Sequence, residues 1–325
     1  MTEKARWEVP SPVQPKPEEV RFDLDRALRS IVSLQANIPE DAFTASILGT
    51  ERAGSGVIIR DSGLVLTIGY LVTEAESVWI TGADGRVTPG HALAYDQETG
   101  FGLVQALGKL GQPALELGKA SDVDLDEPVV LAGGGRRQSV LARIVAKQEF
   151  AGYWEYLLNE AIFTAPAHPF WGGTGLIGQD GKLLGIGSLH VQQMADGGNQ
   201  PRDINMIVPV DLLPPVLDDL LTYGRVNKPA RPWLGVYSAE SEGRIVVADV
   251  AERGPAAAAG LQQGDIISAV RDASVDSLAD FYRKVWACGP AGTEIPIEVV
   301  REKRSHWVRI KSTDRAAFLK KPRLQ

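Results

Sequence analysis

The feature of this sequence that most constrains its fold is a series of short apolar runs separated by glycine and Asp-Gly turns. The series extends from about residue 27 to residue 209, and its runs are either wholly apolar or alternate between apolar and polar residues. Many short strands at such a spacing are typical of β-sandwiches and β-barrels. The clearest runs cover residues 31–34, 56–59, 64–67, 78–81, 128–132 and 183–186.

A helical period follows these runs. Residues 210–221 place apolar side chains at helical spacing, and their consecutive prolines are tolerable only in the first turn of a helix. The next segment, 223–232, carries one glycine and two prolines among polar residues, which is the composition of a linker. We therefore predict that a helix closes a first domain and that a linker leads to a second one.

The second domain is expected over residues 233–313 as a small α+β module. It has a strand pattern at residues 244–248, and residues 295–300 and 306–310 have the pattern of a hairpin. Between them, apolar residues recur at helical spacing from Leu278, and Ser277 stands at the N-cap position. This pattern predicts one amphipathic helix over residues 277–287.

Both ends of the chain differ from these domains. Residues 1–21 are polar and rich in proline, so they lack the apolar area that would offset their ordering entropy. We predict a flexible arm over residues 1–21, a first domain over residues 22–222 and a tail over residues 314–325.

Charge and composition exclude several kinds of function. A net charge of −7 argues against a general nucleic-acid-binding protein, because that role needs a basic surface. The one cysteine, Cys288, cannot form an intrachain disulfide and has no His/Cys cluster around it, so we expect neither a metal nor a cofactor. No stretch of about 18 apolar residues predicts a membrane-spanning helix.

The second domain resembles the PDZ domains of the HtrA family of serine proteases. The resemblance rests on the sequence GPAAAAGLQQGDII at residues 254–267 and on WLGV at residues 233–236. In such domains, backbone N–H groups capture the C-terminal carboxylate of a peptide, while a strand edge accepts the peptide as an added strand. The resemblance assigns peptide binding to the following residues. They are Trp233, Leu234, Gly235 and Val236, together with the helix residues Leu278, Phe281, Tyr282 and Val285.

The first domain is similar to the trypsin-like protease domain of the same family. The matching segments are AGSGVII at residues 53–59, GLVLT at 63–67, DGR at 84–86, DQET at 96–99 and DGKLLGI at 180–186. The resemblance covers roughly residues 27–313. It implies a mostly β fold, in which a chymotrypsin-like double β-barrel of two six-stranded barrels precedes the small α+β PDZ domain.

All three catalytic positions of this family hold other residues here. Acyl transfer on this scaffold needs a serine nucleophile, a histidine base and an acid that orients the histidine. Alignment of the motifs places Tyr70 at the base position, Gly100 at the acid position and Gly172 at the nucleophile position. A tyrosine with a pKa near ~10 is not a general base at neutral pH. The resemblance therefore implies that no catalytic residue remains.

The loop before Gly172 also departs from the family pattern. Phe170 stands at a family glycine that belongs to the oxyanion hole, and Trp171 follows it. This pair either fills the old cleft or consists of ordinary core aromatics, and both readings stay open. His168 lies in the same loop with Thr174 six residues further on, but a threonine nucleophile would need a wholly rebuilt site.

These observations favour a pseudoprotease that binds peptides or protein C-termini through its PDZ domain and has a place in protein quality control. The alternatives are a regulatory subunit of an active HtrA homologue and an HtrA-type serine endopeptidase with a reorganised site. The resemblance leaves a homotrimer open. Family members are often periplasmic, but the N-terminal segment lacks the apolar run of a secretory signal, so we expect a cytoplasmic location. From the net charge we expect no nucleic-acid partner.

Overall fold

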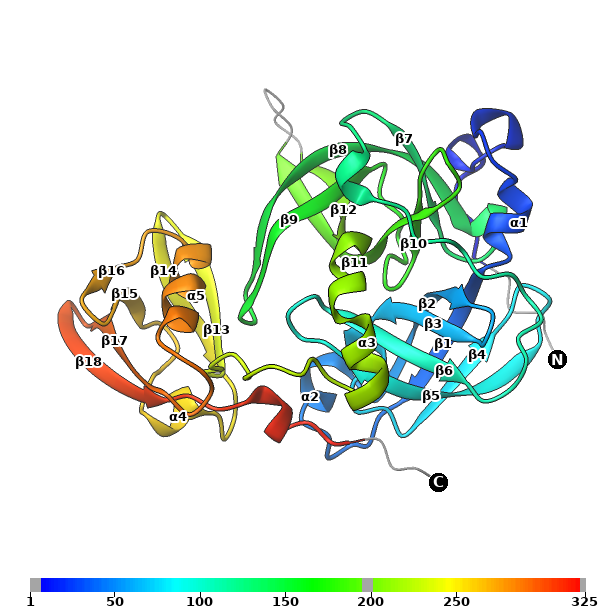
Figure 1. The fold of residues 1–325 in the computed structure, drawn as a ribbon. Coiled ribbons are helices and arrows are strands. Elements are labelled where there is room, and N and C mark those ends of the chain that lie inside the picture. Colours follow the sequence, from blue (N-terminus) through cyan, green and yellow to red (C-terminus); the bar gives the residue numbers. More distant parts are fainter. Residues whose placement is uncertain (1–6, 195–200, 322–325) are drawn as a thin grey trace. The chain divides into compact units, whose positions relative to one another are not determined.

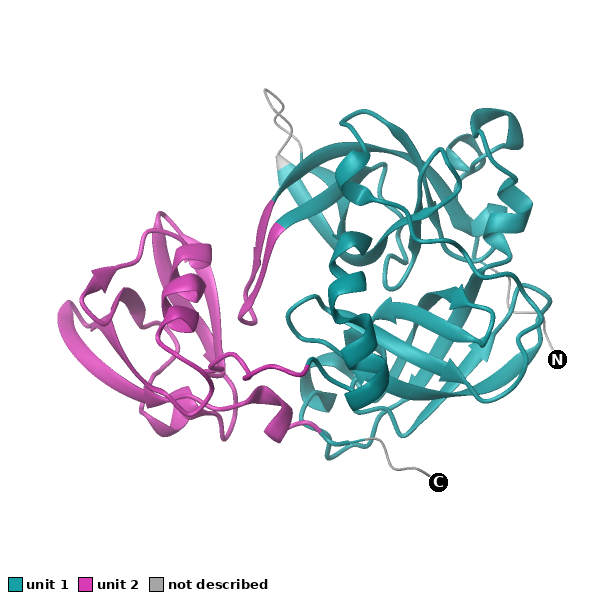
Figure 2. Ribbon diagram, in the orientation of Figure 1, with its two compact units in different colours: residues 1–148, 160–226, 320–325 teal, residues 149–159, 227–319 magenta. Residues whose placement is uncertain are grey.

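The computed structural model describes residues 7–194 and 201–321 (Figure 1). These residues divide into two compact units (Figure 2). Unit 1 contains Met1–Gln148, Glu160–Val226 and Lys320–Gln325, and unit 2 contains Glu149–Asn159 and Asn227–Leu319. The chain therefore leaves unit 1 once in the middle of its protease-like region and again after the closing helix.

Unit 1 holds two closed six-stranded barrels, as the resemblance implied. In the first barrel the strands follow one another in the order β1-β2-β3-β6-β5-β4. Strand β3 is buried along its whole length, whereas β1 alternates between buried and exposed residues in its second half. The strands are β1 (Ile31–Asn37), β2 (Glu51–Arg60), β3 (Leu64–Ile68), β4 (Ser77–Thr81), β5 (Val87–Tyr95) and β6 (Phe101–Ala106).

The second barrel follows the order β10-β11-β12-β9-β8-β7. Its core contains fully buried aliphatic side chains such as Val129, Leu131 and Ile144. The strands are β7 (Pro128–Ala132), β8 (Ser139–Gly152), β9 (Tyr156–Ala165), β10 (Gly175–Ile177), β11 (Leu183–Met194) and β12 (Pro201–Pro209). Each apolar run identified in the sequence lies in one of these strands or in a strand of the first barrel.

Three short helices accompany the barrels, namely α1 (Leu24–Leu28), α2 (Ala45–Leu48) and α3 (Pro214–Tyr223). The predicted closing helix is confirmed in two parts. A 3-10 turn, η6 (Val210–Leu212), precedes α3, which begins with its two prolines and ends at Gly224 in the left-handed conformation with φ of 67°. Prolines fit the first turn because its N–H groups have no partner within the helix.

The PDZ part of unit 2 is a sheet with the path β13-β14-β15-β17-β18, to which β16 adds beside β15. Ser277 caps α5 as predicted, because its side chain accepts a hydrogen bond from Asp280 N. The predicted hairpin is formed by β17 and β18. The elements are β13 (Val236–Ser241), β14 (Arg244–Val250), α4 (Pro255–Ala258), β15 (Ile266–Val270), β16 (Ala273–Ser274), α5 (Leu278–Ala287), β17 (Glu294–Arg301) and β18 (Arg304–Lys311).

The N-terminal segment differs from the flexible arm expected for residues 1–21. From residue 7 onward it is packed, and it contains the 3-10 turns η1 (Ser11–Val13) and η2 (Pro17–Glu19). Val9 is only 2% exposed and belongs to the core of the second barrel. The low apolar content of the segment was misleading, because Trp7 and Val13 also pack against this core and Val9 N donates a hydrogen bond to Arg137 O. Residues 1–6 lie outside the described part of the chain.

The C-terminal segment also lies against the protein. It contains the 3-10 turn η7 (Arg315–Ala317), and the ring of Phe318 packs edge-on against Trp233 at 5.0 Å between centroids. Lys320 N donates a hydrogen bond to Glu74 Oε1 in unit 1. The expected tail therefore belongs to the folded units up to residue 321, beyond which the chain is not described.

Among residues 7–194 and 201–321, no helix has the length and apolar character needed to cross a membrane.

Candidate functional site

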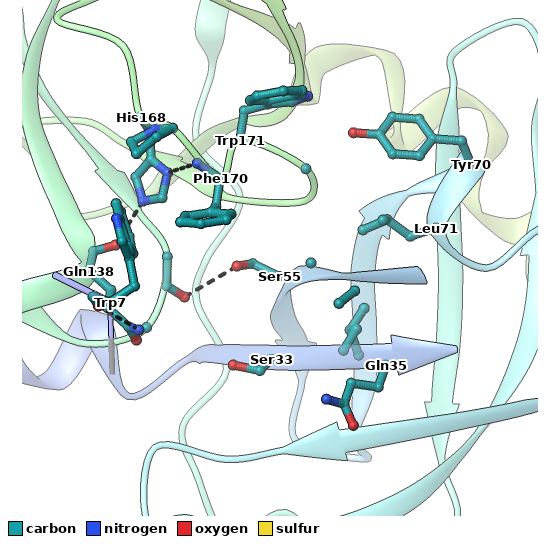
Figure 3. A pocket seen from close by; sticks show the side chains of 17 residues that line it. Trp7, Ser33, Gln35, Ser55, Tyr70, Leu71, Gln138, His168, Phe170 and Trp171 are labelled. Carbon is teal, nitrogen blue, oxygen red and sulfur yellow. Dashed lines mark hydrogen bonds between the residues drawn. The ribbon is translucent and has the colours of Figure 1, made fainter. Parts of the chain in front are cut away.

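A pocket of about 470 Å³ lies in unit 1 where the predicted catalytic positions were expected (Figure 3). Both barrels contribute to its wall. From the first come residues of β1 and β2 and of the 3-10 turn η3 (Gly69–Leu71), and from the second comes the loop before β10. Its lining includes Trp7, Ser33, Gln35, Ser55, Tyr70, Leu71, Gln138, His168, Phe170, Trp171 and Gly172.

Tyr70 and Gly172 face each other at this pocket. A Cβ atom added to Gly172 would lie 2.8 Å from the Tyr70 hydroxyl oxygen, so the tyrosine fills the space beside residue 172. The Tyr70 hydroxyl donates a hydrogen bond of 2.9 Å to Ser188 O. Burial raises the pKa of Tyr70 well above its ordinary value, against a smaller opposing effect from a hydrogen bond with Trp171. The Tyr70 side chain therefore stays protonated at neutral pH and is no base.

Gly100 lies beside the same turn. Gly69 N donates a hydrogen bond of 2.7 Å to Gly100 O, which places Gly100 next to the residue that precedes Tyr70. Gly100 has a φ of 83°, a left-handed conformation that favours glycine. The structure thus brings Tyr70, Gly100 and Gly172 into one neighbourhood, with no carboxylate or imidazole from these three positions.

His168 is a buried structural histidine. Its Nε2 lies 2.8 Å from Gln138 O, and a carbonyl oxygen can only accept, so Nε2 carries the proton. Its Nδ1 accepts a hydrogen bond of 3.1 Å from Phe170 N. Burial lowers the pKa of His168, although these two hydrogen bonds partly oppose the shift. Both ring nitrogens are engaged, and the neutral ring has no free lone pair for a proton.

Phe170 and Trp171 line the pocket without filling it. Phe170 is 59% exposed, and its ring packs edge-on against Trp7 at 4.5 Å between centroids. Trp171 packs against His190 at 5.2 Å. Phe170 is therefore no core aromatic, and the pocket of about 470 Å³ remains beside it. The part played by Trp7 was missed by sequence reasoning, because it comes from the segment expected to be flexible.

The hydroxyl of Thr174 is hydrogen-bonded within its own loop. Thr174 is fully buried, and its Oγ1 donates a hydrogen bond of 2.8 Å to Trp171 O within the same loop. A nucleophilic hydroxyl must instead reach a base and an exposed substrate.

The second candidate site is the loop before β13 in unit 2. Three consecutive amides converge on one carboxylate, that of Glu155. Leu234 N lies 3.0 Å from Glu155 Oε2, and Gly235 N and Val236 N lie 2.7 and 3.0 Å from Glu155 Oε1. Gly235 has a φ of 75°, and this left-handed residue lets neighbouring N–H groups point to the same place. The N–H groups of this loop donate to the carboxylate of Glu155.

The remaining residues assigned to the peptide groove have mixed surroundings. Trp233 pairs through its backbone with Thr313, so its N–H is not part of the carboxylate cradle. Tyr282 reaches the cradle region, because its hydroxyl accepts a hydrogen bond from Glu155 N. The residues of α5 assigned to the groove are all buried in the core cluster of unit 2, namely Leu278, Phe281, Tyr282 and Val285.

Sequence reasoning missed Glu155. It lies 80 positions before Gly235, in the turn between β8 and β9, and nothing in its local sequence marks it as a ligand. Among residues 7–194 and 201–321, no group of three or more His, Cys, Asp or Glu side chains is arranged to hold a metal ion.

Comparison with known proteins assigns both parts of the chain. The family described as "Trypsin-like peptidase domain" matches residues 54–186, and the family described as "PDZ domain" matches residues 232–311. A solved structure, "HtrA-type protease AlgW with decapeptide", shares this fold with a TM-score of 0.52 and 24% identity over 92% of this chain and 98% of that one. The chain thus combines a trypsin-like peptidase domain with one PDZ domain and is similar to HtrA-type proteases.

Curated serine endoproteases are similar to this chain along most of its length. The "Probable periplasmic serine endoprotease DegP-like" of Pseudomonas fluorescens is 26% identical over 270 residues, which are 78% of this chain and 54% of that protein. "Serine endoprotease DegS" of Salmonella typhimurium is 24% identical over 306 residues, which are 88% of this chain and 83% of that protein. The chain spans about half the length of the Pseudomonas relative.

Proposed function

We propose that this chain is a catalytically inactive pseudoprotease of the HtrA type that binds peptides or protein C-termini through its PDZ domain. The observation that carries the proposal is the Tyr70–Gly172 pair at the pocket. Gly172 has no hydroxyl, and a protonated tyrosine occupies the space next to it. Without a nucleophile and a base, the pocket cannot carry out the first step of acyl transfer, which is attack on the substrate carbonyl.

The neighbouring residues support inactivity rather than a rebuilt site. The two ring nitrogens of His168 are engaged by Gln138 and Phe170. Phe170 N stands where the family has an oxyanion donor, but here it donates its hydrogen bond to His168 Nδ1. It is therefore not free to stabilise an oxyanion. The Thr174 hydroxyl donates its hydrogen bond to Trp171 O. An endopeptidase with a reorganised site, the alternative reading, would have to break these contacts.

A fluorophosphonate probe tests this proposal, because such probes label only activated hydroxyl nucleophiles. We expect no labelling of the purified chain and no hydrolysis of a fluorescein-labelled unfolded casein. Thr174→Ala is the informative variant, and Thr164→Ala, another buried threonine of the second barrel, is its matched control. Labelling that Thr174→Ala abolishes and Thr164→Ala preserves would establish a threonine nucleophile and overturn the proposal.

Two further parts of the proposal concern partners and location. A scaffold of this kind acts alone, as a homotrimer or as a regulatory subunit of an active HtrA homologue, and sedimentation of the purified chain with and without such a homologue separates these forms. The Pseudomonas relative is named as periplasmic, so the cytoplasmic location predicted from the N-terminal sequence gains no support from it. Cell fractionation tests that location.

A further inference from the structure

We infer that the PDZ domain carries its own internal ligand, the β8–β9 hairpin turn, and that Glu155 takes the place of a peptide's C-terminal carboxylate. This inference rests on the proposed function of the PDZ domain and adds how its binding site is regulated. The hairpin tip, residues 149–159, belongs to the same compact unit as the PDZ sheet (Figure 2). Glu155 is only 5% exposed, and its carboxylate receives the N–H groups of Leu234, Gly235 and Val236.

The backbone of the turn also resembles a bound peptide. Ser238 N, on β13, donates a hydrogen bond of 2.9 Å to Tyr153 O, as a sheet edge does when it accepts an added strand. The Tyr282 hydroxyl, from α5, donates a hydrogen bond of 2.8 Å to Gly152 O. The turn therefore makes contacts with both walls that a peptide groove of this type offers, one strand edge and one helix.

An apolar side chain of the hairpin completes the resemblance. Leu157, two residues after Glu155, is 9% exposed and belongs to the core cluster of the PDZ domain, which includes Phe281 and Val285 of α5. A peptide bound in this mode places a side chain in such a pocket while its carboxylate occupies the loop. Carboxylate, strand-like backbone and apolar side chain are thus all supplied by the chain itself.

The conformation of Glu155 is a second, independent observation. Its φ is 59°, in the left-handed region where glycine or asparagine is favoured in a hairpin turn. A residue of this type in that conformation is strained, and such strain persists where surrounding contacts hold it. The three amide hydrogen bonds to its carboxylate are contacts of that kind, and glycine at this position would not supply them.

Occupancy of the loop has a direct consequence for binding. A free C-terminus needs the same three N–H groups, so it binds only to molecules in which the hairpin has left the groove. The apparent dissociation constant is then the intrinsic one divided by the fraction of molecules with an open groove. The displaced hairpin stays attached to β8 and β9, so it remains at high local concentration and returns when the peptide dissociates.

Hydrogen exchange of the full chain tests the internal ligand without any peptide. In Glu155→Ala the amides of Leu234, Gly235 and Val236 should exchange at least about tenfold faster than in the parent chain, and Glu155→Gln should give a smaller increase. Alanine keeps the strained backbone but lacks the carboxylate. Glu160→Ala is the matched control, because Glu160 is an exposed glutamate on β9, the strand that follows the turn, and belongs to unit 1. Unchanged exchange in Glu155→Ala would overturn the inference.

Tyr282→Phe provides a variant that leaves the carboxylate in place. It removes the hydrogen bond to Gly152 O and the acceptor of Glu155 N. Faster exchange of the same three amides in this variant supports docking of the whole turn. Exchange that is unaltered in Tyr282→Phe but faster in Glu155→Ala would reduce the internal ligand to the carboxylate alone and contradict the peptide-like contacts.

Peptide binding separates this inference from the proposed function. The probe is a fluorescein-labelled heptapeptide pool, randomised at every position, with free carboxylates in one preparation and C-terminal amides in the other. We expect Glu155→Ala to bind the free-acid pool at least about tenfold more tightly than the parent chain does, and neither to bind the amides. Equal binding by both proteins would overturn self-inhibition. Faster exchange in Glu155→Ala without binding of any pool would leave the internal ligand established and refute PDZ capture of C-termini.

Discussion

At the scale of single residues, the contact between Tyr70 and Gly172 couples two positions that lie on different barrels. Gly172 lies in the loop before β10, and Tyr70 lies in η3 after β3. Only the Tyr70 hydroxyl comes close to a Cβ at residue 172, because the next atoms, from Leu71 and the Tyr70 ring, lie at 3.7 Å. The Tyr70 hydroxyl therefore leaves room only for glycine at residue 172. The effect of a larger side chain at residue 172 on stability should depend on whether this hydroxyl is present.

A double-mutant cycle measures this dependence. We expect Gly172→Ala to lower the free energy of unfolding by about 1–3 kcal/mol, because an extra methyl group is forced against a well-packed hydroxyl. In a Tyr70→Phe background the same change should cost less than about 0.5 kcal/mol, although Tyr70→Phe itself loses the hydrogen bond to Ser188 O. Urea unfolding of the four proteins gives the coupling. Equal costs of Gly172→Ala in both backgrounds would contradict the contact.

At the scale of elements, the tip of the β8–β9 hairpin packs with the PDZ sheet and helix, and no local sequence pattern predicts this. Both strands belong to the second barrel, yet residues 149–159 lie in unit 2. Arg283 of α5 donates a hydrogen bond of 3.2 Å to Asn159 Oδ1 and forms an ion pair with Glu149. The hairpin is thus held to the PDZ sheet and helix along both of its strands.

Docking of this hairpin should depend on pH. Burial raises the pKa of Glu155 to about 7, while hydrogen bonds from the amides of residues 234–236 and the charge of Arg315 oppose the shift. The other titratable groups that face it are the Tyr282 and Tyr237 hydroxyls. Because the docked carboxyl holds its proton more tightly than a released one of pKa 4.5, docking is strongest below about pH 4.5 and weakens as the pH rises to about 7.

Hydrogen exchange at several pH values checks this prediction. After correction for intrinsic rates, the amides of Leu234, Gly235 and Val236 should open roughly tenfold or more often at pH 8 than at pH 5.5, since each unit of pKa difference is worth a factor of about ten. Glu155→Gln should remove the dependence, because its side chain does not titrate. A profile that is flat in the parent chain, or that persists in Glu155→Gln, would contradict the role of this carboxyl.

At the scale of the whole molecule, the pocket in unit 1 combines parts of both barrels, and the proposed loss of activity involves more than three side chains. Gly100 has a φ of 83°, a left-handed conformation that glycine adopts at lower cost than aspartate does. The Phe170 amide donates a hydrogen bond to His168 Nδ1. The side chain of a serine at residue 172 would come too close to the Tyr70 hydroxyl. Catalysis needs these groups in one geometry, so each departure removes a condition of the reaction.

Restoring the family residues should therefore not restore proteolysis. We expect the triple variant Tyr70→His, Gly100→Asp, Gly172→Ser to hydrolyse labelled casein no faster than a matched triple variant with Gly172→Ala. The reason is the missing oxyanion donor at Phe170, which is still bonded to His168. Hydrolysis that depends on the serine would mean that the loop rearranges readily and that the three side chains alone separate this chain from an active protease.

The sequence by itself determined the two-part architecture, the barrel strands and the position of α5 with its Ser277 cap. These features follow from local periodicity, turn residues and motif order, which a linear sequence records directly. Only the tertiary structure decided that Glu155 occupies the loop at Gly235, that Val9 anchors the N-terminal segment and that Phe170 N bonds to His168. The first two are contacts between segments far apart in the chain, and the third depends on how a loop is folded between two barrels. None of these three contacts leaves a periodic signal in the sequence, because packing selects such partners only after the strands and helices have come together.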